Sequence, residues 1–233
     1  MNTNKLRAPL DITMTLLSVI LMGGTMLFPD DRIHQICGMA LLALWAVHIA
    51  LNRLWFGGLF KGRRDARRAL QITVNAGILI CALTLGASGL LMAWFVPAEF
   101  VGGALDFART AHLLASHWYY IFMAFHIGLH GSMILRACHS RAQACHSSAP
   151  TRESGQKAPL ALRIAAAALC LYGIYAFIAR GLWKYMLGLQ QFFFFDFERG
   201  HVLFALDYLC ILVLFGTISY YLGKLATKTK ENN

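Results

Sequence analysis

The stretch that decides the fold runs from residue 69 to residue 98 and reads ALQITVNAGILICALTLGASGLLMAWFVPA. These 30 residues contain no Asp, Glu, Lys or Arg. A membrane-spanning helix needs about 20 mostly apolar residues, so the stretch is long enough to cross a bilayer. Two more uncharged intervals, 33–52 and 110–135, hold 20 and 26 residues. The sequence therefore predicts three membrane-spanning helices in these intervals.

Three other apolar segments extend the prediction to six helices. They lie at about 9–28, 160–182 and 202–223. The chain of 233 residues is 58% hydrophobic and 14% charged. Soluble domains carry about 45–50% apolar and about 25% charged residues, so a single soluble domain and a disordered chain are disfavoured. No separate signal peptide is expected, because no small-residue cleavage site follows the first apolar segment.

Basic residues orient these helices. They gather at the N-terminus, after the second and fourth helices and at the C-terminus, whereas the alternate connections hold fewer of them. Lys and Arg are enriched in cytoplasmic loops, so the pattern predicts that both termini lie in the cytoplasm. The net charge of +10 then comes from basic loops on one side of a lipid bilayer, and no nucleic-acid partner is expected.

Composition divides the chain into two membrane units. Residues 1–137 are predicted to form a four-helix bundle, and residues 160–233 a C-terminal helix pair. Residues 138–159 are rich in Ser, Ala and Arg, which is typical of a cytoplasmic linker. The stretch at about 183–198 mixes Trp, Tyr and Phe with charged residues and predicts an interfacial helix at the outer surface.

Four histidines occur at one spacing in two of the predicted helices. His34 and His48 are 14 residues apart, and so are His112 and His126. Fourteen helical residues rise about 21 Å and return to within about 40° of the starting direction, so each helix presents two imidazoles on one face. The second and fourth helices of an up-down bundle run in the same direction. His34 is therefore predicted to be level with His112, and His48 with His126.

Two levels with two facing imidazoles match the requirement of two stacked bis-histidine haems. Haem iron takes axial ligands from opposite faces of the ring, and helix bundles build such sites from facing helices. The chain has no C-x-x-C-H motif, so b-type haem is predicted. Copper or quinone sites that use histidine stay open. An alternative of another class is a transporter or assembly factor with structural histidines.

Further residues are candidates for binding the cofactor. Arg32, Arg53 and Arg109 lie near helix ends, where they could neutralise haem propionates. His130 shares the face of the predicted ligands. It could replace His126 as a ligand, or it could hydrogen-bond a propionate or a quinone head group.

Other polar residues have competing interpretations. His117 points about 140° away from the ligand face and is expected to be structural. Asp207 is an acid inside an apolar segment and so a functional candidate, with an ion pair to Arg180 as the structural alternative. The Cys-His repeats at 137–140 and 144–147 lack the usual zinc spacing and are interpreted as part of the solvated linker.

Several short motifs resemble one bacterial family. They are Arg7-Ala-Pro-Leu-Asp11, His48-Ile-Ala-Leu-Asn-Arg53, Arg109-Thr-Ala-His112-Leu-Leu-Ala-Ser116, His126-Ile-Gly-Leu-His130, Leu206-Asp-Tyr-Leu209 and Tyr220-Tyr221. In these motifs the chain resembles the flavinylation-associated cytochrome family, long labelled a domain of unknown function. The resemblance covers the first four helices well and implies haem ligands at His34, His48, His112 and His126, with His130 as an additional position.

The resemblance also implies a fold and a function. Together with the apolar segments, it predicts an all-α integral membrane protein with six transmembrane helices and a four-helix dihaem bundle. The likeness of this bundle to that of cytochrome b rests on the histidine spacing alone and is an analogy. Such a protein lies in the cytoplasmic (inner) membrane of a bacterium. It carries electrons between a quinol or cytoplasmic flavoprotein and an extracytoplasmic flavoprotein or other acceptor, as an electron-transfer subunit rather than a stand-alone enzyme.

Some questions stay open at this point. The alternative redox function is a haem-bearing membrane anchor of a periplasmic reductase, or a ferric-reductase-like subunit. A bound quinone and a homodimer are both compatible with the sequence.

Overall fold

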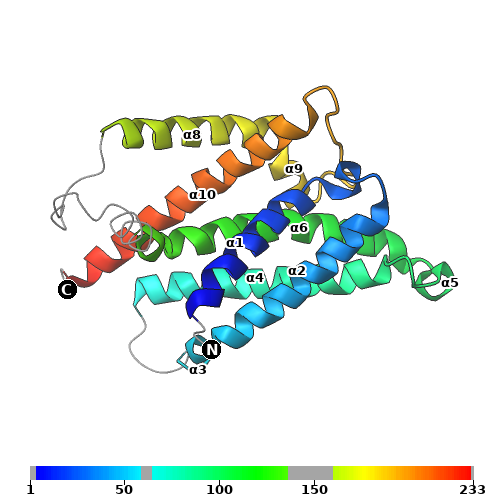
Figure 1. The fold of residues 1–233 in the computed structure, drawn as a ribbon, viewed down its shortest axis with the longest axis horizontal. Helices are drawn as coiled ribbons and strands as arrows, with labels where there is room; N and C mark the ends of the chain where they lie inside the picture. Colours follow the sequence, from blue (N-terminus) through cyan, green and yellow to red (C-terminus); the bar gives the residue numbers. More distant parts are fainter. Residues whose placement is uncertain (1–3, 59–64, 136–159, 232–233) are drawn as a thin grey trace.

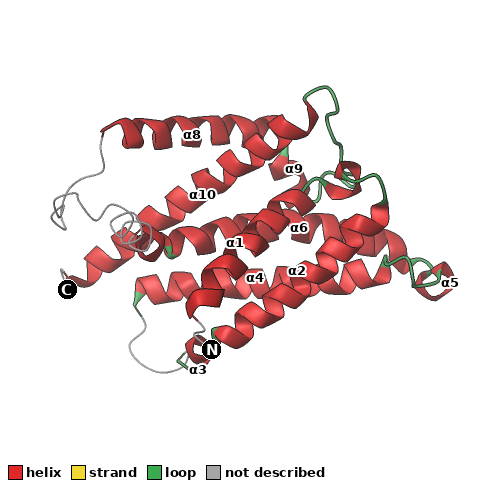
Figure 2. Ribbon diagram, in the orientation of Figure 1, coloured by secondary structure: helices red, strands yellow, loops and turns green. Residues whose placement is uncertain are grey.

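The computed structural model describes residues 4–58, 65–135 and 160–231, and all regular secondary structure within these ranges is helical (Figure 2). The long helices are α1 (Asn4–Leu21), α2 (Asp31–Leu51), α4 (Ala66–Leu91), α6 (Ala104–Leu129), α8 (Leu160–Ala179) and α10 (Gly200–Glu231). The short ones are η1 (Gly24–Leu27), α3 (Arg53–Gly57), α5 (Ala98–Val101) and α9 (Leu182–Met186). The predicted linker at 138–159 lies outside the described residues.

Four of the described helices are long and apolar enough to cross a membrane. They are α2, α4, α8 and residues 200–227 of α10. The chain is thus suited to be a multi-pass membrane protein. The other two long helices carry more polar residues. Arg7 and Asp11 lie in α1, and Asp106, Arg109 and several histidines lie in α6.

Aspartate side chains cap the N-termini of α2 and α4. The Asp30 carboxylate accepts a hydrogen bond from the Arg32 backbone N–H at 2.8 Å and caps α2. The Asp65 carboxylate caps α4 in the same way, through the Arg68 backbone N–H. Such caps satisfy donors that a helix leaves free at its N-terminus. Acidic residues a few positions before these two apolar segments therefore start their helices.

The long helices lie side by side, with α3 and the C-terminal end of α10 at one end of the molecule and α5 at the other (Figure 1). Helix α6 is central, because it packs against α4 on one side and α10 on another. Helix α2 packs against α1, η1 and α4, and none of its residues is buried. The core accordingly lies around α6, while α2 lies at the edge.

Helices α6 and α10 are in close contact at Gly128. A Cβ atom added there would lie 2.0 Å from both the Gly216 carbonyl oxygen and the Ser219 Oγ atom. The Ser219 hydroxyl donates to the Phe125 carbonyl at 2.9 Å. Small residues let two helix backbones come into contact within a membrane, where close packing and interhelical hydrogen bonds drive association. This contact joins the C-terminal helices to α6.

Gly128→Val is expected to force α6 and α10 apart and to destabilise the fold by about 1–3 kcal/mol or more, the range for overpacking a tight core. The measurement is thermal unfolding of the detergent-solubilised protein. Gly57→Val is the matched control, because a Cβ at Gly57 meets no atom within 4 Å. Equal melting temperatures for the two variants would contradict the close contact.

The aromatic outer segment differs from the expected interfacial helix. Only Leu182–Met186 is helical, and Gly188 follows with a φ of 68°. This left-handed conformation favours glycine and ends the helix. Residues 187–199 form no further helix. Phe195 is buried, and the Phe193 ring lies against Gly24, so the segment folds back onto the bundle.

Candidate functional site

The structure brings the four predicted histidine ligands together as two pairs. The ring centroids of His34 and His112 are 6.4 Å apart, with an angle of 64° between the ring planes. The centroids of His48 and His126 are 6.3 Å apart, with an angle of 73°. We call His34–His112 the first pair and His48–His126 the second pair. Each pair joins α2 to α6, so these two helices run in the same direction.

The two pairs span a space between α2 and α6. Helix α2 makes its main backbone contacts with α1, η1 and α4 rather than with α6. All four imidazoles are partly exposed although they come from facing helices. A Cβ atom added at Gly38, one turn after His34, would meet no atom within 4 Å. There is therefore open space beside the first pair.

The separation within each pair suits one metal ion held between two imidazoles. A metal–imidazole bond is about 2.0–2.1 Å, and with about 1.1 Å from each nitrogen to its ring centroid, two bonds in line place the centroids about 6.2–6.4 Å apart. The observed separations of 6.4 and 6.3 Å fall within this range. A direct hydrogen bond between two ring nitrogens would bring the centroids closer together.

The second pair has an acceptor at each Nδ1 atom. The His48 Nδ1–H donates to Asp11 Oδ1 at 2.8 Å, and the His126 Nδ1–H donates to Asn75 Oδ1 at 2.8 Å. When Nδ1 carries the proton of a neutral imidazole, the lone pair is on Nε2. Metal-binding histidines are oriented in this way by a carboxylate or carbonyl on the other nitrogen. In both histidines the Nε2 lone pair is therefore free to bind a metal.

The first pair has one such partner. The Ser88 hydroxyl donates to the Thr84 carbonyl at 2.6 Å, so its oxygen accepts from the His112 Nδ1–H at 3.0 Å. The His34 Nδ1 atom is buried and has no hydrogen-bond partner in the described part of the chain. The two pairs therefore share their spacing but differ in what surrounds them.

Sequence reasoning did not single out Asp11, Asn75 or Ser88 as partners of the histidines. The available signal was a polar residue within an apolar segment, which is costly in a membrane unless it has a partner. Arg7 was missed as well. Its Nη2 donates to the Leu51 carbonyl at 2.9 Å, and its Nε atom is buried without a hydrogen-bond partner among the described residues.

The arginines predicted to bind propionates lie at or near the ends of α2 and α6. Arg32 and Arg53 are exposed. The Arg109 side chain is 58% exposed and lies 3.5 Å from the Asp106 carboxylate. Within the described ranges, no hydrogen bond or ion pair joins these arginines to the histidine pairs.

His130 ends α6 beside the second pair. Its ring centroid is 4.7 Å from that of His126, and the ring planes are 55° apart. Of these two residues, the structure places His126 opposite His48. His130 is therefore positioned as a neighbour of the second pair.

His117 lies in a different environment. Its side chain is buried and stacks on Tyr185, with ring centroids 4.4 Å apart and planes 9° apart. Its Nδ1–H donates to the Leu113 carbonyl at 2.8 Å. These contacts agree with the structural interpretation of His117.

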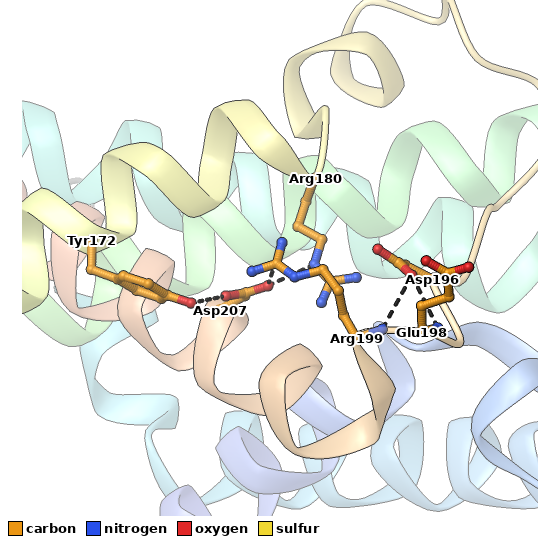
Figure 3. A network of polar contacts seen from close by, with 6 residues as sticks. All are labelled: Tyr172, Arg180, Asp196, Glu198, Arg199 and Asp207. Atoms are coloured by element: carbon orange, nitrogen blue, oxygen red, sulfur yellow. Dashed lines mark hydrogen bonds and ion pairs between the residues drawn. The ribbon is translucent and has the colours of Figure 1, made fainter.

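Asp207 forms a separate polar centre between α8 and α10 (Figure 3). Its carboxylate is fully buried and accepts hydrogen bonds from the Tyr172 hydroxyl and the Arg180 Nε–H, both at 2.7 Å. The Arg199 guanidinium lies 3.6 Å away. The ion pair with Arg180 is thus present, and it joins the two C-terminal helices.

Among the residues that the structure describes, no three His, Cys, Asp or Glu side chains gather as a metal site. The Cys-His repeats of the predicted linker fall outside those residues. No protein-family model, curated protein or solved structure matches the chain. The likeness to flavinylation-associated cytochromes consequently rests on the short sequence motifs.

Proposed function

We propose that this chain is a b-type dihaem cytochrome that carries electrons across a membrane. The observation that carries the proposal is the pair of facing imidazoles found twice between the same two helices, at 6.4 and 6.3 Å. A single buried histidine is often structural. Two pairs with the spacing of a bis-imidazole metal site are much harder to explain by packing alone.

We propose six membrane spans, with α1 and α6 added to the four apolar candidates. Helix α6 packs between α4 and α10, which are both candidate spans, and α1 packs along α2. The polar residues that lower the hydropathy of these two helices include the histidines and the Asp11 partner. In a membrane such polar groups are tolerated when they face the bundle interior and have partners.

The chain's own residues would hold two haems. His34 and His112 would hold one haem, and His48 and His126 the other. The Asp11, Asn75 and Ser88 oxygens would orient three of these rings and keep their Nε2 atoms unprotonated. When bound, b-type haem supplies one-electron redox chemistry, whose potential depends on the ligands, hydrogen bonds and burial.

The positions of the two pairs favour transfer across the bilayer rather than along one surface. The pairs are 14 residues apart on each helix, or about 21 Å along the axis, in a hydrocarbon layer about 30 Å thick. The charge pattern supports a cytoplasmic position for the second pair, and the resemblance supports a bacterial inner membrane. The motifs favour a quinol or cytoplasmic flavoprotein on that side and a flavoprotein or other acceptor outside.

The purified protein is expected to be red, with a low-spin b-type spectrum and two haems per chain in a pyridine haemochrome assay. A colourless protein without haem would reject the cytochrome and favour a transporter or assembly factor. A value of one haem per chain would reject the two-level arrangement. The partner that co-purifies in mild detergent separates a transmembrane conduit from a reductase anchor.

A further inference from the structure

The two histidine pairs differ in the charge of the groups that contact them. Asp11 is a carboxylate, whereas the partners of His126 and His112 are a neutral amide and a neutral hydroxyl. His34 has no hydrogen-bond partner at Nδ1 among the described residues. A carboxylate therefore contacts one ligand of the second pair directly, whereas the Asp31 carboxylate acts on His34 of the first pair only over a longer distance.

The Asp11 charge is not neutralised by an adjacent cation. In the part of the chain that the structure describes, His48 is the single ion-pair partner of the Asp11 carboxylate. Arg7 lies one turn earlier on α1, but its guanidinium donates to the Leu51 carbonyl at 2.9 Å. Asp11 is 53% exposed, so solvent screens its longer-range field. Its effect must come mainly through the hydrogen bond to His48.

That hydrogen bond has a defined electronic consequence. A carboxylate that accepts the Nδ1–H of an imidazole makes the Nε2 atom more basic and a stronger electron donor. A stronger donor stabilises the oxidised, more positively charged form of a bound metal, which lowers its reduction potential. A neutral amide or hydroxyl acceptor has a smaller effect in the same direction.

We propose, on the basis of the proposed function, that Asp11 is a positioning residue that gives the His48–His126 level the lower reduction potential of the two. In a singly reduced protein the electron then resides at the His34–His112 level, which is the level farther from α3. The favoured direction of electron transfer is from the end of the bundle that carries α3 toward the end that carries η1 and α5. Asp11 thus contributes to the difference in reduction potential that favours this direction.

The test is a redox titration of the purified full-length protein, followed by its visible spectrum. Asp11→Asn keeps the shape of the side chain but removes its charge, and it is expected to raise the lower of the two midpoint potentials and leave the higher one in place. Asp11→Glu retains the charge and is expected to stay close to wild type. Ser88→Ala is the matched variant at the first pair and is expected to move the higher potential alone.

Single-haem variants provide a second measurement that does not depend on Asp11 variants folding. His34→Ala leaves the second pair intact and His48→Ala leaves the first, so the remaining haem of His34→Ala is expected to titrate at the lower potential. The reverse order would overturn the proposal, as would an Asp11→Asn protein with both haems and unchanged potentials. Absence of haem from the wild-type protein would instead refute the proposed function itself.

Discussion

His34→Ala and His112→Ala are each expected to lose one of the two haems, and both are expected to lose the same one. The centroids of these two rings are 6.4 Å apart, the spacing of two ligands on one metal. A b-type haem is not covalently attached, so removing either histidine is expected to release it or to leave it weakly bound. The measurement is the pyridine haemochrome count, expected to fall from two to one per chain, with the reduced spectrum of the remaining haem.

The double variant makes this prediction sharper. Residues that act on one site show non-additive effects, so His34→Ala/His112→Ala should lose no more haem than either single variant. His48→Ala and His126→Ala are expected to remove the other haem. His201→Ala, at an exposed position at the start of α10, is the control and should retain both. A double variant without any haem would contradict the pairing.

His130→Ala separates the two candidates at the end of α6. His126 is the residue that faces His48, with ring centroids 6.3 Å apart, so the His130→Ala protein should keep two haems. A count of one haem in His130→Ala and two in His126→Ala would assign the ligand to His130 instead.

Asp207→Ala is expected to destabilise the protein by about 3–5 kcal/mol, the cost of removing one partner of a buried ion pair. The variant leaves the Arg180 side chain, which is 9% exposed, without its counter-charge. It also removes the acceptor of the Tyr172 hydroxyl. The measurement is thermal unfolding in detergent, where a fall in melting temperature of several degrees is expected.

Two variants control for this effect. Asp106→Ala removes an exposed carboxylate 3.5 Å from Arg109 and should leave the melting temperature unchanged. Arg180→Leu/Asp207→Leu removes the buried Arg180 charge together with its partner and should be less destabilised than Asp207→Ala, because the remaining cation, Arg199, is partly exposed to solvent. If Asp207→Ala melts like the wild type, the buried ion pair does not hold α8 to α10. The folded Asp207 variants are expected to keep the wild-type haem count, because the histidine pairs lie between α2 and α6 rather than between α8 and α10.

The apolar segments of the sequence predicted the positions of the helices. They predicted less completely which helices are apolar enough to cross a membrane. The uncharged interval 69–98 corresponds to α4, and the interval 33–52 to α2. By apolarity and length, however, only four described helices qualify as candidate spans. Helices α1 and α6 carry more polar residues, and these include Asp11, His112 and His126 of the candidate site. The predicted interfacial helix is shorter than expected, because the chain adopts a left-handed conformation at Gly188.

What the sequence determined by itself is the spacing of histidines along each helix. The rise and turn per residue of an α-helix do not depend on its neighbours, so a separation of 14 residues defines two levels on one face before any packing is known. The direction of α2 relative to α6 also follows from sequence, since consecutive membrane helices alternate. The two histidine pairs could therefore be proposed in advance.

Only the tertiary structure decided which side chains surround each pair. Asp11 lies 37 positions from His48 and Asn75 lies 51 positions from His126, on helices whose rotation about their own axes is set by packing. The burial of Asp207 against Arg180 and Tyr172 likewise depends on how α8 meets α10. Helical periodicity is a local property of the chain, whereas the neighbours of a helix depend on the packing of the whole bundle.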